Sequence, residues 1–259
     1  MTEEEWLHGS HYNDMYGAVR QYMTDRKVRL YMAACCRLES ASFLDPAITD
    51  AVETAERCAD DADVEAAVCD LEKEYLSSWV APAGELGRVI ASIWRLTLEM
   101  PSPPDIDGGE TYSSVHAAVA HAALLGLRNL PRVVFTGGSG DAVEYCSHAI
   151  EHAALVRLGV NKGDFQISQV QRRTQLANIL RDIFGNPFRP VRFDVRWRTS
   201  KVIDLSRTIY EGRAFERLPI LADALMDAGC ADEQVLEHCR SDGPHVRSCW
   251  VVDVVLGKE

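Results

Sequence analysis

Apolar residues recur at helical spacing along most of the chain, most clearly in the stretch that begins at Thr24. There Val28, Tyr31, Met32 and Cys35 stand at positions i, i+3, i+4 and i+7, which places them on one face of a helix. No segment sustains the alternation of apolar and polar residues that marks a half-buried strand. The pattern therefore predicts an all-α protein, an irregular bundle of roughly ten helices.

Start and stop signals set the expected ends of several helices. Thr2 and Glu5 have the spacing of a capping box, and Asp45-Pro46 supplies an N-cap followed by proline at the first helical position. Gly185 followed by Asn186-Pro187 is a stop signal, because proline cannot continue a helix. After two short N-terminal helices, helices are expected over residues 24–37, 46–59, 62–80, 85–99, 112–126, 141–158, 165–184, 200–213, 216–228, 232–240 and 245–256.

Two interruptions divide this helical pattern. Residues 101–110 contain three prolines and two glycines, which cannot continue a helix. They predict a linker between an N-terminal helical region, residues 1–100, and a C-terminal helical region, residues 111–259, although the two can also pack as one domain. The second interruption, residues 188–198, predicts a short extended segment.

Composition narrows the class of protein. A chain of 259 residues with 47% hydrophobic and 25% charged residues is ordinary for a globular protein, and this excludes collagenous, disordered and disulfide-stapled classes. No apolar run reaches the roughly 18 residues of a membrane span. The acidic start of the chain is unlike a secretory signal. We therefore expect a cytoplasmic protein without membrane contact, with its eight cysteines reduced.

Charge is distributed unevenly within a net charge of −12. Residues 39–74 carry twelve acidic and two basic side chains, whereas residues 172–201 carry eight basic and two acidic ones. This contrast favours self-association or a protein partner, and it makes a non-enzymatic interaction module our leading hypothesis. The candidate binding residues are those of the basic stretch: Arg189, Arg192, Arg196, Arg198 and Lys201.

The same basic stretch allows two other interpretations. Its arginines alternate with Phe193 and Trp197, a combination that can bind phosphates and stack on unpaired bases, so nucleic acid is an alternative partner. The alternate residues Val191, Phe193, Val195 and Trp197 can instead pack inward while the arginines stay in water.

One motif resembles a zinc-hydrolase helix. His148 and His152 are four residues apart, so both imidazoles face one side of a helix, and Glu151 lies beside them as a candidate catalytic residue. A third ligand could come from His116 or His121. The alternative is a histidine pair without a metal on an alanine-rich helix.

A second group of metal-ligating residue types lies near the C-terminus. It comprises Cys230, His238, Cys239, His245 and Cys249. Thiolates and imidazoles are the ligands of structural zinc sites, although these spacings are not those of a zinc finger. A nucleophilic Cys239–His245 pair and simple packing without any cofactor are the alternatives.

Both ends of the chain carry longer recognisable stretches. Near the N-terminus these are Thr2-Glu-Glu-Glu-Trp-Leu and Arg26-Lys-Val-Arg-Leu-Tyr-Met-Ala-Ala-Cys-Cys-Arg37. Near the C-terminus they are Ile183-Phe-Gly-Asn-Pro-Phe-Arg-Pro, Leu218-Pro-Ile-Leu-Ala-Asp-Ala-Leu-Met-Asp-Ala-Gly-Cys230, His238-Cys-Arg240 and His245-Val-Arg-Ser-Cys-Trp-Val-Val-Asp-Val-Val-Leu-Gly-Lys258.

These stretches resemble a family of uncharacterised bacterial helical proteins that often occur in many copies per genome. The resemblance implies a helical fold and assigns no activity, and it does not include His148 to His152. The segment from Leu221 to Gly229 is also similar to the tail of short helical modules found beside leucine-rich repeats, which implies an interaction role by association.

Overall fold

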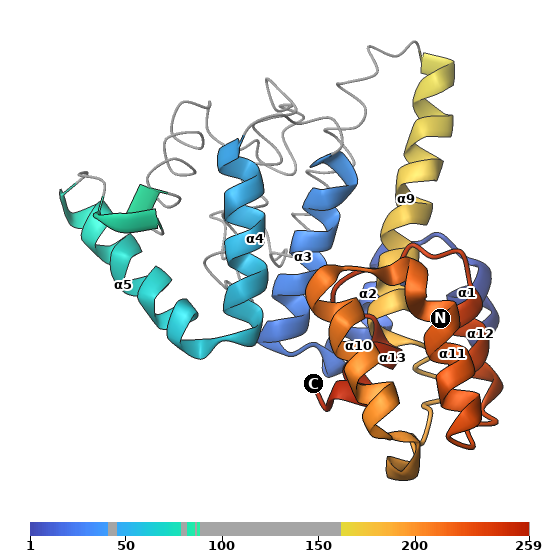
Figure 1. Cartoon of the computed structure of the whole chain (residues 1–259). Helices are drawn as coiled ribbons and strands as arrows, with labels where there is room; N and C mark the ends of the chain where they lie inside the picture. The colour runs from blue at the N-terminus through green and yellow to red at the C-terminus, as the bar shows by residue number, and fades with distance from the viewer. Residues whose placement is uncertain (41–45, 79–81, 86, 89–161, 259) are drawn as a thin grey trace. The chain divides into compact units, whose positions relative to one another are not determined.

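The computed structural model describes residues 1–40, 46–78, 82–85, 87–88 and 162–258, coloured in Figure 1. These ranges contain ten α-helices and no strand, so the all-α prediction is confirmed. The expected linker 101–110, the expected helices 112–126 and 141–158 and most of the helix expected over 85–99 lie outside them. Within the described ranges, no helix combines the length and the apolar character needed to cross a membrane.

The chain divides into two compact units. The terminal unit joins both ends of the chain, Met1–Met23 and Thr174–Glu259, and the middle unit comprises Thr24–Arg173.

Three helices of the middle unit follow the sequence signals closely. They are α3 (Asp25–Ser40), α4 (Pro46–Asp60) and α5 (Ala62–Ser78). The predicted apolar face of α3 is buried, with Tyr31 and Cys35 fully inaccessible. Between α4 and α5, the carboxylate of Asp61 accepts the backbone N–H groups of Asp63 and Val64 and so begins the next helix.

The N-terminal part of the terminal unit consists of α1 (Glu3–His8), α2 (Tyr12–Val19) and the 3₁₀ helix η1 (Arg20–Tyr22). Both halves of the predicted capping box are present. Thr2 Oγ1 accepts the N–H of Glu5 at 3.2 Å, and Glu5 Oε2 accepts the N–H of Thr2 at 2.7 Å.

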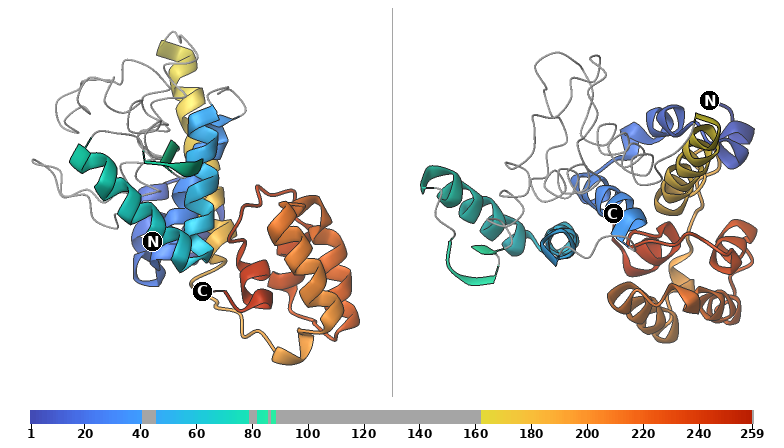
Figure 2. Two further views of the ribbon diagram at one scale, coloured as in Figure 1. Left: turned by 60° about the vertical axis from the view of Figure 1, so that its left-hand side comes forward. Right: turned by 90° about the horizontal axis from the view of Figure 1, so that it is seen from above.

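The C-terminal part of this unit begins with the end of α9 (Lys162–Phe184), which stops at Gly185 in a left-handed conformation with φ of 62°. Four α-helices follow: α10 (Ser200–Gly212), α11 (Leu218–Asp227), α12 (Glu233–Arg240) and α13 (Trp250–Leu256). The 3₁₀ helix η2 (Val195–Trp197) precedes α10, and η3 (Phe215–Arg217) precedes α11. These four helices gather around one apolar core, and they form the orange-to-red cluster in both views of Figure 2.

Two segments differ from their predictions. Residues 188–194 are irregular and not helical, but η2 interrupts the predicted extended segment 188–198 and turns Val195, one of the residues expected to pack inward, outward to 71% exposure. Val191, Phe193 and Trp197 do pack against the core, as the inward-packing interpretation expects. The last helix begins at Trp250 instead of residue 245, because Pro244 and the left-handed Ser248 (φ 85°) break the helical path.

Candidate metal centre

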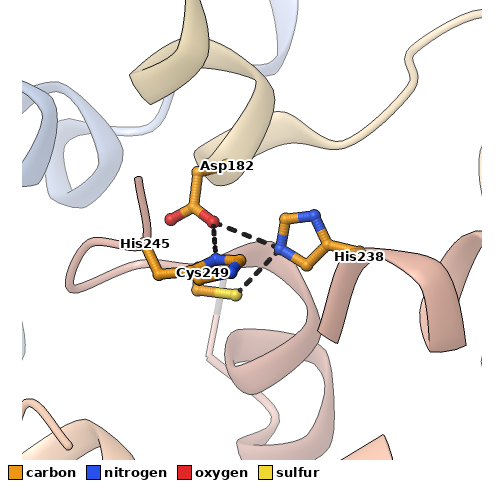
Figure 3. A group of neighbouring side chains, drawn as sticks. All are labelled: Asp182, His238, His245 and Cys249. Atoms are coloured by element: carbon orange, nitrogen blue, oxygen red, sulfur yellow. Dashed lines mark hydrogen bonds and ion pairs between the residues drawn. The ribbon is translucent and has the colours of Figure 1, made fainter. Parts of the chain in front are cut away.

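Four side chains of the terminal unit converge on one point: Asp182, His238, His245 and Cys249. The atoms that each could offer to a metal ion lie within 4.8 Å of one another. Asp182 comes from the last turn of α9, His238 from α12, His245 from the loop that follows, and Cys249 from the residue before α13 (Figure 3).

Local structure explains why these residues meet. The side chain of Asp232 accepts the N–H of Val235 and begins α12, which buries Val235 and Cys239 in the core. His238 precedes Cys239 in the helix, so its ring leaves the helix about 100° away from the thiol and points out of the core. The irregular path through Pro244 to Ser248 then brings His245 and Cys249 back to the same point.

The closest contacts centre on one oxygen and one nitrogen. Asp182 Oδ1 lies 2.7 Å from His245 Nδ1 and 3.2 Å from His238 Nε2. The same His238 Nε2 lies 3.2 Å from Cys249 Sγ (Figure 3). The two imidazole rings meet edge to face, with their centroids 5.0 Å apart.

Further contacts hold these side chains in place. The backbone N–H of Val246 donates to Asp182 Oδ2 at 2.8 Å, which leaves Oδ1 directed at the histidines. His245 Nε2 lies 3.2 Å from the carbonyl oxygen of Ser241, which can only accept, so Nε2 can donate there. A cation at the centre would replace the proton that Nδ1 shares with Asp182 and take up the Nδ1 lone pair. Such outer contacts are typical of histidine and carboxylate ligands in metal sites.

Electrostatics at the centre are dominated by burial and by the one carboxylate. Burial acts to raise the pKa of Asp182, but hydrogen bonds from His238 and His245 outweigh it and lower the pKa below its usual value. Burial acts to lower the pKa of His245, and the hydrogen bond to Asp182 raises it instead. Burial, and then the charge of Asp182, raise the pKa of the Cys249 thiol well above its usual value.

This arrangement does not suit a nucleophilic cysteine. In a catalytic triad the histidine uses opposite ring nitrogens for the nucleophile and for the carboxylate. Here Cys249 and Asp182 both contact His238 Nε2. Cys249 is also fully inaccessible, and its raised pKa keeps the thiol protonated in the absence of a cation.

The donor set does fit a zinc ion. Two imidazole nitrogens, one thiolate and one carboxylate oxygen are all zinc ligands, whereas calcium and magnesium prefer oxygen alone. Tetrahedral zinc spaces its ligand atoms about 3.3–3.8 Å apart. The closest contacts of this centre, at 2.7–3.2 Å, are hydrogen bonds, and all four ligand atoms lie within 4.8 Å, so shifts of about 1 Å or less would exchange these hydrogen bonds for bonds to the ion. The two negative charges of the carboxylate and the thiolate would balance a divalent cation and leave this buried point neutral.

The structure brings together three of the five C-terminal residues that the sequence singles out: His238, His245 and Cys249. Cys230 and Cys239 instead lie in the apolar core of α10–α13, where burial raises the pKa of Cys239 to about 12. His148, Glu151 and His152, with the additional candidates His116 and His121, lie outside the described residues.

Sequence reasoning missed Asp182. The only signal available is an acidic residue inside a helical stretch whose neighbours Ile179, Leu180 and Ile183 are all apolar and, in the structure, fully buried. An acidic side chain on such a turn calls for a buried partner.

The basic stretch proves to be largely paired with carboxylates of the same unit. Arg189 contacts Glu3 at 2.8 Å, Arg196 contacts Asp194, and Lys201 contacts Asp227 at 3.1 Å. Arg192 is exposed, whereas Arg198 is half-buried with its guanidinium against Gly257. The local positive charge is therefore weaker than the sequence suggests.

Comparison of the chain with protein-family models, with curated proteins and with solved structures finds no match.

Proposed function

We propose that the terminal unit is a non-enzymatic, zinc-stabilised module in which one metal ion joins α9, α12 and the start of α13. The observation that carries this proposal is the convergence of Asp182, His238, His245 and Cys249 within 4.8 Å. Four donors from three separate segments give a cation a site that the unfolded chain does not offer, so its binding free energy adds to folding.

Several features favour a structural role over a catalytic one. Four protein ligands complete a tetrahedron, whereas catalytic zinc keeps one position open for water or substrate. The side chains of Asp182 and His245 are 2% and 7% exposed, and Cys249 is inaccessible, so little room is left for a substrate.

Elemental mass spectrometry of protein purified without a histidine tag tests the proposal. We expect about one zinc per chain, lost in the Cys249→Ala and Asp182→Asn variants. The control is a double variant, His148→Ala with His152→Ala, which should keep its zinc. Loss of zinc in the control variant, with zinc kept in Cys249→Ala and Asp182→Asn, would favour the alternative hydrolase helix with Glu151. Absence of zinc from the wild type would exclude both sites.

We also propose a second function, binding of an acidic protein partner through the turn from Arg192 to Arg198. The supporting observation is Val195, an apolar side chain that is 71% exposed. It lies on a turn that is anchored by the edge-to-face packing of Phe193 and Trp197, with ring centroids 5.2 Å apart. The centres of protein contacts are apolar and enriched in arginine, and Arg192 on the same segment is exposed.

Crosslinking at low and moderate salt tests this second function, including association of the chain with itself. The variant Val195→Asp should abolish the crosslinked product, and Arg196→Ala should weaken it, whereas Arg207→Ala on α10 serves as a control. Nucleic acid is the competing partner. Binding to an oligonucleotide that falls steeply with salt and is lost on changing Arg196 and Arg198 to Ala would contradict the protein-partner proposal.

A further inference from the structure

The end of α9 holds the N-terminal helix as well as the candidate metal centre. Arg181 Nε donates to the carbonyl oxygen of Trp6 at 2.7 Å, and Arg181 Nη2 donates to the carbonyl oxygen of Gly9. These carbonyls belong to the C-terminal end of α1, where a cation is favoured. The guanidinium of Arg181 therefore caps α1.

The contact is reciprocal. The indole N–H of Trp6 donates to the carbonyl oxygen of Gly185 at 2.9 Å, just past the last turn of α9. Trp6 is only 1% exposed. Glu3 adds two polar contacts to the same end of α9, one from Asn186 Nδ2 and one from Arg189, both at 2.8 Å.

The next residue of α9 belongs to the metal centre. Asp182 follows Arg181 directly and faces His238 and His245. Gly185, whose carbonyl oxygen accepts the Trp6 hydrogen bond, also lies close to the indole of Trp250. A Cβ added at Gly185 would stand 3.2 Å from that ring. Trp250 in turn packs against His238, with ring centroids 5.3 Å apart. One helical turn is thus shared by the two sets of contacts.

The N-terminal helix depends on this turn for its order. Helix α1 has six residues, and helices this short do not persist in water without tertiary contacts. Its contacts to residues 181–189 include the burial of Trp6 and the capping by Arg181. Anything that fixes the last turn of α9 should therefore favour the docked state of α1.

We infer that metal binding at Asp182, His238, His245 and Cys249 controls the docking of the N-terminal helix through the shared last turn of α9. The inference rests on the proposed zinc site. When the metal is bound, Asp182 is held and α1 docks; when the metal leaves, the turn loosens and the N-terminal segment is released.

Hydrogen exchange of the full chain, read by mass spectrometry with zinc and after chelation, tests this inference. We expect the amides of residues 3–8 to exchange at least about tenfold faster after chelation, since a loss of docking reduces local protection. In Arg181→Ala, zinc content should stay at about one per chain and zinc should still protect α12 and α13. The amides of residues 3–8 should then exchange fast with or without metal.

A second variant keeps the test decisive where Arg181→Ala fails to fold. Trp6→Phe removes the indole N–H bond to Gly185 and keeps an aromatic ring and the Arg181 bonds, so the difference that chelation makes to the exchange of residues 3–8 should be smaller than in the wild type. Zinc bound at one per chain with no effect of chelation on residues 3–8 would overturn the inference and leave the proposed zinc site intact. A chain that binds no zinc would overturn both.

Discussion

Carboxylates in buried ion pairs have different partners in the two units. In the middle unit, the buried Glu56 contacts Arg37 through two bonds, at 2.8 and 3.2 Å, and the partly exposed Glu65 contacts the buried Arg29 at 2.7 Å. In the terminal unit, the buried Asp182 faces two histidines, and Cys249 lies beside them. Arginine carries a fixed positive charge, whereas imidazole and thiol can lose a proton and offer a lone pair.

This difference shows where a cation can be accommodated. The negative charge of a carboxylate that is paired with a guanidinium is already neutralised, and the fixed positive charge of the guanidinium would repel a metal ion. A carboxylate surrounded by imidazole and thiol groups gains a partner of full charge when a divalent cation binds. The chemistry of the neighbours, more than the presence of a buried acid, therefore identifies the candidate site.

Removal of metal should cause the largest loss of stability, and the loss should be confined to the terminal unit. Chelation is expected to lower the unfolding free energy of the terminal unit by about 4 kcal/mol, the value for a ligand present at a thousand times its Kd. Hydrogen exchange of α10–α13 measures this loss, and α3–α5 provide the internal comparison. Equal loss of protection in both sets of helices would contradict a stabilising role confined to the terminal unit.

The stability that the carboxylate–arginine pairs give the middle unit should fall on substitution and should not depend on metal. Arg29 is 2% exposed, so Glu65→Gln would leave a buried charge without its carboxylate. Breaking a fully buried pair costs 3–5 kcal/mol, but Glu65 is partly exposed, so we expect a loss of about 2 kcal/mol in denaturant unfolding, with zinc content unchanged.

The matched control for Glu65→Gln is Asp70→Asn on the same helix. Asp70 contacts Lys73 at 3.0 Å, and both side chains are highly exposed, so its replacement should change stability little. A loss of stability in Asp70→Asn as large as that in Glu65→Gln would show that burial does not decide the strength of these pairs.

Local signals in the sequence predicted the helices well because caps and stops act over a few residues. The Thr2–Glu5 capping box, the Pro46 start and the Gly185 stop all depend on contacts within one helical turn. Where the prediction was wrong, at residues 245–249, the cause is Pro244 together with the left-handed backbone of Ser248, and no local preference indicates the latter.

The candidate site was only partly predictable for the same physical reason. His238, His245 and Cys249 lie within eleven residues of sequence, so their residue types stand out together. Asp182 precedes His245 by 63 residues, and only the tertiary contacts of the last turn of α9 with His238 and with the loop at His245 and Val246 bring it to them. The sequence could not show that Cys239 points into the core while its neighbour His238 points out of it.

A substitution at Gly185, at the end of α9, should cause a smaller loss of stability. Gly185→Ala forces a left-handed alanine and brings a Cβ within 3.2 Å of the Trp250 ring. We expect a loss of about 1–2 kcal/mol, measured by thermal unfolding of the terminal unit. Gly212→Ala is the control, since a Cβ added there would meet no atom within 4 Å apart from its chain neighbours and the adjacent backbone of its own helix, and it should leave stability unchanged or slightly improved. Equal destabilisation by both substitutions would show that neither the left-handed conformation of Gly185 nor its proximity to Trp250 requires a glycine there.

The smallest effect is expected at the surface of the terminal unit, where Lys201 Nζ contacts Asp227 at 3.1 Å. Both side chains are about two-thirds exposed or more, so solvent screens the pair and side-chain entropy opposes it. Lys201→Met keeps the apolar stem and removes the charge, and we expect the Tm to change by less than about 1 °C. Zinc content should not change, because Lys201 is not one of the four converging residues. A drop of several degrees would mean that this exposed ion pair stabilises the terminal unit far more than solvent screening allows.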